Sequence, residues 1–285
     1  MGTDSTKVIS WNIAKRASAW KALAEMAGRG DADLALLQEA GDPPSEIASQ
    51  FGFQNDALGL DLFDRWPLVV ALSDRVKVES FKQVPANGGY SKRELGVSGI
   101  GTLAAARVVP HGREADAFIA VSMYARWMRA HPTTGPHPRI HADISVHRIL
   151  SDMQTFIDSL DPSKYRILAA GDLNIFYGAD GSTLSWPERE RLVWQRFDSL
   201  GLVFLGPQAP NGRPSASAQP DVPAGTLNVP TYRTNKQTPA EANRQLDYAF
   251  ASRGFHERIK VRALNRVEEW GPSDHCRLSI EIDGQ

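Results

Sequence analysis

The feature that most constrains this chain is the tetrapeptide Gly171-Asp172-Leu173-Asn174, which directly follows the largely apolar run of residues 165–170. Asp and Asn are poor strand formers, so a strand over 166–171 should end here. In an extended segment, residues i and i+2 point to the same side. Asp172 and Asn174 should therefore project together from the end of a buried strand, an arrangement suited to activating water beside a phosphate.

The same pattern, an apolar run with an acid, amide or imidazole at its end, recurs along the chain. The further segments are VISWN (8–12), LALLQE (34–39), QLDYAFA (245–251) and SDH (273–275), the last of which precedes an alternating apolar and polar stretch at 276–282. Few folds need polar strand ends five times unless those ends converge on one site. The candidate site residues are therefore Asn12, Glu39, Asp172, Asn174, Asp247, Asp274 and His275.

In this order, the segments SWNI, LLQE, GDLN, LDYAFAS and SDH resemble those of the endonuclease/exonuclease/phosphatase superfamily, the group of deoxyribonuclease I and exonuclease III. Together with the strand-like runs that adjoin them, they extend from residue 8 to residue 282, so the resemblance covers nearly the whole chain. Each segment alone is weakly specific, and the signal is their order and spacing. The resemblance implies a metal-dependent phosphoesterase.

Hydrophobic patterning predicts alternating strands and helices. We expect strands at 7–12, 33–38, 68–73, 76–83, 99–109, 116–124, 166–171, 202–205, 229–233, 246–252, 258–264 and 276–282, and helices near 18–29, 44–51, 143–160 and 186–200. Many strands with few amphipathic helices favour two sheets packed face to face, with the helices outside. The resemblance refines this α/β expectation to a four-layer α/β/β/α sandwich of two packed mixed sheets. Long loops at 128–142 and 206–230 are expected to be functional.

Composition is consistent with a globular enzyme. The 285 residues are 42% hydrophobic, which is enough for a full core, and the spread of the segments favours a single catalytic domain over 1–285. The lone Cys276 excludes an internal disulfide framework. No run approaches 18 apolar residues and the first strand leaves no room for a signal peptide, so we expect no membrane association and a cytoplasmic location.

The donor set of Glu, Asp and Asn with one His suits a hard cation, Mg²⁺ or Mn²⁺, and does not suit structural zinc. The resemblance assigns Glu39, Asp274 and Asn12 to the metal. It assigns Asp172 to positioning or deprotonating water, and Asn174 to a hydrogen bond with water or phosphate. His275 would contact the phosphate oxygens, oriented by Asp247. The alternatives are a solvated acid at Glu39 and a simple turn at 172–174.

The resemblance also suggests residues that contact the substrate. Tyr124 stands where many members carry a histidine, and a phenol there could hydrogen-bond phosphate. Thr231 and Arg233 would line the substrate groove, with Asn12 beside them. Arg126 and Trp127 follow Tyr124, and their residue types could bind phosphate and stack a base. Each has a structural alternative: an interface aromatic for Tyr124, scaffold packing for Trp127, and an ordinary strand for Thr231 and Arg233.

The predicted function is a nuclease that hydrolyses nucleic acid by in-line attack of water, with DNA favoured over RNA. The net charge of −1 gives no sign of a strongly basic surface, although arginines and histidines gather at 126–148. The alternative is a phosphoesterase that uses the same site on a small-molecule or lipid phosphate. A catalytically inactive scaffold is disfavoured because every candidate site residue is present. The sequence leaves endo- versus exonuclease action and oligomeric state open.

Overall fold

Two β-sheets form the centre of the computed structural model, which describes residues 5–51, 67–85, 91–98, 103–126, 128–129, 140–157, 161, 164–179, 187–219 and 222–284. Over these residues, one sheet has five strands in the order β14-β15-β1-β2-β3, and the other has six in the order β12-β13-β11-β8-β7-β4. Each sheet holds a parallel pair, β1 with β2 and β8 with β11, among antiparallel pairs. Both sheets are therefore mixed, as predicted.

The strands of the five-stranded sheet are β1 (Thr6–Asn12), β2 (Leu34–Gln38), β3 (Leu68–Ala71), β14 (Ile259–Leu264) and β15 (Arg277–Ile282). Those of the six-stranded sheet are β4 (Val76–Ser80), β7 (Leu103–Pro110), β8 (Phe118–Tyr124), β11 (Ile167–Asp172), β12 (Leu202–Gly206) and β13 (Asp247–Ser252). The helices are α1 (Ala17–Gly28), α2 (Ser45–Gln50), α3 (Ala142–Met153) and α4 (Pro187–Ser199). Two small ribbons pair β5 (Lys82–Pro85) with β6 (Glu94–Val97), and β9 (Met128–Arg129) with β10 (Ile140–His141).

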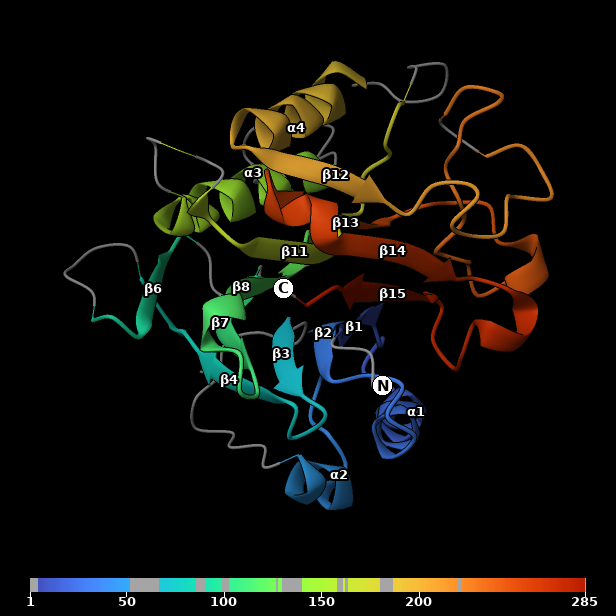
Figure 1. Ribbon diagram of the computed structural model, residues 1–285. Coiled ribbons are helices and arrows are strands. Elements are labelled where there is room, and N and C mark those ends of the chain that lie inside the picture. The colour runs from blue at the N-terminus through green and yellow to red at the C-terminus, as the bar shows by residue number, and fades with distance from the viewer. Residues whose placement is uncertain are drawn as a thin grey trace.

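The two sheets pack face to face, and helices cover their outer surfaces (Figure 1). One apolar cluster fills the space between the sheets. A second joins α3 and α4 to the outer face of the six-stranded sheet, and a third joins α1 and α2 to the outer face of the five-stranded sheet. The predicted four-layer α/β/β/α sandwich is confirmed. No helix within the described residues is long and apolar enough to cross a membrane.

Strand β11 shows how alternation places the site. Leu168 and Ala170 belong to the cluster between the sheets, whereas Ile167 and Ala169 belong to the cluster under the helices. Because side chains alternate along a strand, Asp172 falls on the same face as Leu168 and Ala170. The inner face of β11 is therefore apolar up to the edge of the sandwich, where its last residue, Asp172, places a buried carboxylate.

Three element predictions were wrong in detail. The strand expected at 229–233 is reduced to isolated bridges at Tyr232, because Pro230 cannot donate to a ladder and the segment pairs with a different neighbour on each side. The helix expected over 143–160 ends at Met153, continues as a 3-10 turn to Phe156, and is extended at Ile157. The strand expected over 76–83 divides at Phe81 into β4 and β5, which pair in different sheets.

Glycine at position 171 is required by a close approach of two backbones. A Cβ atom added there would overlap the carbonyl oxygen of Met123 on the neighbouring strand β8. That oxygen belongs to the backbone in the middle of the sheet, so it cannot move away as a flexible side chain could.

We therefore expect Gly171→Ala to lower the free energy of unfolding by about 2 kcal/mol, as overpacking of a core does. Urea-induced unfolding followed by circular dichroism measures this. Gly28→Ala is the matched control, because a Cβ atom there meets no heavy atom within 4 Å. Equal unfolding midpoints for the two variants would contradict the steric argument.

Candidate active site

Polar side chains end the inner faces of several neighbouring strands at one edge of the sandwich. Asn12 ends β1 and pairs in register with Gln38, which ends β2. In the other sheet, Asp172 ends β11 and pairs with Tyr124 of β8 on one side and Asp247 of β13 on the other. Antiparallel strands enter where parallel strands leave, so β13 begins at the edge where β8 and β11 end.

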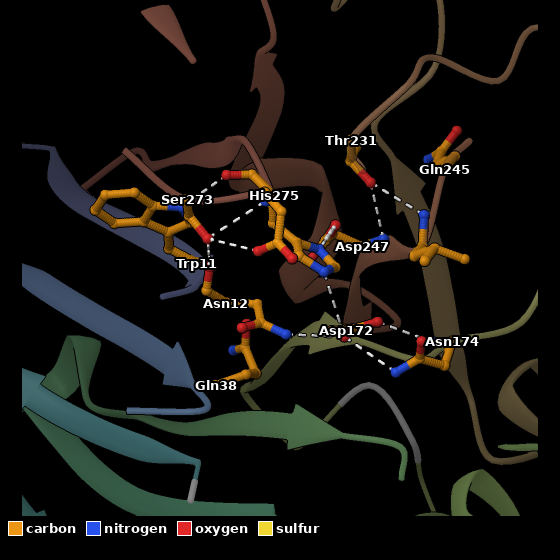
Figure 2. A network of polar contacts seen from close by, with 12 residues as sticks. Trp11, Asn12, Gln38, Asp172, Asn174, Thr231, Gln245, Asp247, Ser273 and His275 are labelled. Carbon is orange, nitrogen blue, oxygen red and sulfur yellow. Dashed lines mark hydrogen bonds and ion pairs between the residues drawn. The ribbon is translucent and has the colours of Figure 1, made fainter. Parts of the chain in front are cut away.

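Asp172 is the centre of the hydrogen-bond network (Figure 2). Its Oδ2 accepts hydrogen bonds from Nδ2 of Asn12 at 3.0 Å and from Nδ2 of Asn174 at 3.1 Å, and its Oδ1 accepts one from the backbone N–H of Asn174 at 3.0 Å. Asn174 is itself held by a hydrogen bond from Nδ2 to the carbonyl of Ala125. The carboxylate is 1% exposed, so these donors replace the water that it loses.

Burial of Asp172 has an electrostatic consequence. Desolvation raises the pKa of Asp172 to about 7; His275 and the amide of Asn12 counteract the rise, while Asp247 and Glu39 add to it. A carboxylate with a pKa near neutrality can take up a proton and release it again at physiological pH.

His275 is oriented by Asp247. Its Nδ1 lies 2.8 Å from Oδ2 of Asp247, and its Nε2 lies 3.8 Å from Oδ2 of Asp172. Burial alone lowers the pKa of His275, but the carboxylates of Asp247 and Asp172 outweigh it and raise that pKa to about 10. The ring is therefore an imidazolium at neutral pH, with its Nε2–H toward Asp172.

The three residues Asp172, Asp247 and His275 are close enough to hold a metal ion, since one ligand atom from each lies within 4.8 Å of the others. Their hydrogen bonds argue for a different use. Nδ1 of His275 is engaged with Asp247, a protonated imidazole cannot ligate a cation, and both oxygens of Asp172 accept amide hydrogen bonds. In this structure the three residues form a buried cluster in which two carboxyl groups face one imidazole ring.

The residues assigned to a metal by resemblance lie next to this trio. Glu39 directly follows β2 and is half-buried, with Oε1 3.5 Å from Nδ2 of Asn12. Asp274 is also half-buried, and its Oδ1 lies 3.2 Å from the hydroxyl oxygen of Ser273. The side chain of Asn12 bridges Glu39 and Asp172 through its nitrogen, while its oxygen accepts the backbone N–H of Ala14 at 3.0 Å. Glu39 and Asp274 thus offer carboxylate oxygens of the kind that Mg²⁺ prefers.

Backbone strain is concentrated at this edge. Among the described residues, the non-glycine positions with positive φ are Ala14, Lys15, Glu39 and Asn174, and all follow strands that end at the site. Such conformations cost of order 1–3 kcal/mol each and persist where the surrounding structure holds them. At Glu39 and Asn174 the strained backbone turns the chain just after a strand and sets the direction of a candidate site side chain.

The remaining residues predicted to contact the substrate differ in burial and in hydrogen bonding. Thr231 is fully buried, and its hydroxyl accepts the backbone N–H groups of Leu246 and Asp247. These two hydrogen bonds hold the backbone at the start of β13. The guanidinium of Arg233 donates to the carbonyl of Gln237 at 2.9 Å. Tyr124 is buried beside Asp172.

Two further substrate-contact predictions lie at the end of β8. Arg126 is half-buried, and its backbone N–H donates to Ser145 on α3. Trp127 lies outside the described residues.

Three supporting residues were not singled out from the sequence. The hydroxyl of Ser273 donates to the carbonyl of Asn12 at 2.7 Å, and the indole of Trp11 donates to the carbonyl of His275 at 2.9 Å. Gln38 joins the two sheets by donating to the hydroxyl of Ser122 at 2.9 Å. The sequence marks these residues only by their position, since Trp11, Gln38 and Ser273 each adjoin a candidate site residue.

Comparisons with known proteins agree with this fold. The profile described as "Endonuclease/Exonuclease/phosphatase family" matches residues 9–275. The solved endonuclease domain of TRAS1, a telomere-specific non-LTR retrotransposon, aligns over 98% of this chain and 99% of its own, with a TM-score of 0.57 and 15% identity. The AP endonuclease LMAP from Leishmania major aligns over 99% of this chain and 88% of its own, with a TM-score of 0.59 and 17% identity. No curated protein sequence matches the chain.

The charge state of His275 can be tested directly. We expect both ring nitrogens of His275 to carry hydrogen at pH 8 in metal-free protein, because the carboxylates of Asp247 and Asp172 raise its pKa to about 10. Nitrogen-15 NMR of histidine-labelled protein shows this, and His275→Gln assigns the signal. Asp247→Asn removes a negative charge and should lower the titration midpoint. A neutral ring at pH 8 in the wild type would contradict the assignment.

Proposed function

The chain belongs to the Endonuclease/Exonuclease/phosphatase family, and from that premise we propose that it is a divalent-metal-dependent phosphodiesterase that cleaves nucleic acid. The reaction is hydrolysis of one P–O bond by in-line attack of water. Residues 1–285 act as one catalytic domain, since the polar strand ends that form the site come from positions 12 to 275.

The observation that carries this proposal is the contact between Asp172 and His275. A phosphodiester resists attack because its anionic oxygens repel the nucleophile. The site offers an imidazolium and, 3.8 Å away, a carboxylate whose pKa is raised to about 7. The imidazolium of His275 offsets the negative charge that grows on the phosphate. The carboxylate of Asp172 accepts a proton from the attacking water.

The neighbouring side chains keep these two groups in place. Asn12 and Asn174 hold the carboxylate of Asp172 in place by donating from their side-chain amides to its Oδ2. Asp247 fixes the His275 ring through Nδ1, which leaves Nε2–H to donate to a non-bridging phosphate oxygen. Tyr124, next to Asp172 in register, supplies a phenol for the leaving-group side.

Glu39 and Asp274 would hold Mg²⁺ or Mn²⁺, with Asn12 next to them. The oxygen donors of this set fit a hard cation, which keeps part of its hydration and binds phosphate oxygens. A bound cation supplies positive charge to the phosphate and lowers the pKa of water.

The names of the two similar structures support DNA as the substrate. One is the endonuclease domain of a telomere-specific retrotransposon, and the other is an AP endonuclease. The family also contains phosphatases, so the preference for a polymer must come from residues that flank the site.

We expect Asp172→Ala to lower turnover by about 100- to 10,000-fold, the range for loss of a general base, while leaving the fold intact. The assay is Mg²⁺- or Mn²⁺-dependent nicking of supercoiled plasmid, with EDTA as the chemical control. Asp198→Ala, at an exposed position on α4, is the matched control and should nick like the wild type. A folded Asp172→Ala protein that keeps wild-type activity would refute the mechanism.

Metal binding is tested at Glu39. Glu39→Gln should raise the Mn²⁺ concentration needed for half-maximal nicking by about tenfold or more, because the amide loses the negative charge that attracts the cation. Calorimetric titration of Mn²⁺ gives an independent affinity. Glu25→Gln, exposed on α1, is the control. Unchanged metal dependence in Glu39→Gln would rule out this residue as a ligand.

A further inference from the structure

Three segments distant in sequence form a short ladder beside the site. Tyr232 makes isolated antiparallel bridges with Arg244 on one side and with His275 on the other. The first is closed by the N–H of Tyr232 donating to the carbonyl of Arg244 at 3.0 Å. Residues directly opposite in antiparallel pairs point to the same face. His275, Tyr232 and Arg244 therefore present their side chains in a row, in that order.

The first two members of this row are in contact. The rings of Tyr232 and His275 have centroids 4.9 Å apart and planes inclined by 50°. Partial burial raises the pKa of the Tyr232 phenol; the carboxylate of Asp274 adds to the rise, and the guanidinium of Arg244 opposes it. The phenol thus lies within electrostatic reach of the acidic centre and of Arg244.

Arg244 and its neighbour Arg233 each have a buried Nε without an acceptor, but Arg233 also donates to the carbonyl of Gln237. The side chain of Arg244 makes no ion pair and no hydrogen bond with any described residue. Arg213 on the adjoining loop, by contrast, donates to three backbone carbonyls. A buried guanidinium N–H without an acceptor is unfavourable, and an anionic ligand would supply the missing acceptor.

We propose that Arg244 binds a second phosphate of the substrate, on the same nucleic-acid strand as the phosphate that is cleaved at His275. The proposal rests on the nuclease function proposed above and deepens it. A planar guanidinium forms paired hydrogen bonds with phosphate oxygens, and neighbouring strands lie about 4.8 Å apart, so Arg244 begins about 10 Å from His275 across the ladder. Tyr232 lies between the two phosphates. Arg244 thereby favours a polymer over a substrate with a single phosphate.

The test is steady-state cleavage of a DNA duplex over about 50–200 mM KCl. Each phosphate contact contributes about 0.9 to the slope of log affinity against log salt. Arg244→Gln should raise KM by about tenfold at low salt and reduce the salt slope of kcat/KM by about 1. Arg253→Gln is the matched control, because Arg253 is 59% exposed and directly follows the opposite end of β13 from Asp247.

A second variant separates charge from geometry. Arg244→Lys keeps the positive charge but not the planar fork, so it should retain the wild-type salt slope and show an intermediate KM. Thermal unfolding checks the fold of each variant, and Arg244→Met replaces Arg244→Gln if glutamine lowers stability. A wild-type KM and salt slope in the charge-removing variant would overturn the inference while wild-type cleavage still supports the nuclease. A wild type that cleaves no nucleic acid would overturn both.

Discussion

The buried carboxylate of Asp172 is the interaction on which the rest of the site depends. A carboxylate removed from water must be compensated by donors, and here they come from both sheets: Asn12 from β1, Asn174 after β11, and the imidazolium of His275 before β15. Asn12 lies 160 positions before Asp172 in the sequence, and His275 lies 103 positions after it. The contacts of Asp172 link strand ends of both sheets, and the burial that raises its pKa to about 7 suits the carboxyl group to exchange a proton near neutral pH.

The sandwich supplies the geometry that this charge needs. Two sheets packed face to face bury their inner surfaces along their length, and polar residues interrupt that apolar layer at the edge where the site lies. Gln38 and Ser122 tie the sheets together just inside the edge, and Thr231 supports the N–H groups at the start of β13. The candidate site residues consequently project from well-supported strand ends.

Local sequence predicted much of the site, because an acid or amide at the end of an apolar run marks a strand end wherever it occurs. The strand ends at the five segments were predicted on that basis, and the four-layer sandwich was predicted from the resemblance. The structure confirms the sandwich. The supporting roles of Ser273, Trp11 and Gln38 could not be predicted, since each depends on a carbonyl or hydroxyl supplied by a strand far away in sequence. Thr231 is instructive: its position in the sequence suggested a groove, and packing turned its hydroxyl toward the backbone.

Local sequence was enough to predict the strands that carry the candidate site residues, the positions of those residues at strand ends and the chemical nature of the donor set, because strand propensity and alternation are local properties. Which of these residues lie in contact depends on how the two sheets pack. The pKa values of Asp172 and His275 depend on burial and on charges brought together from separate strands. The row of His275, Tyr232 and Arg244 exists only because two bridges place residues 275, 232 and 244 side by side, and no local pattern encodes such long-range pairing.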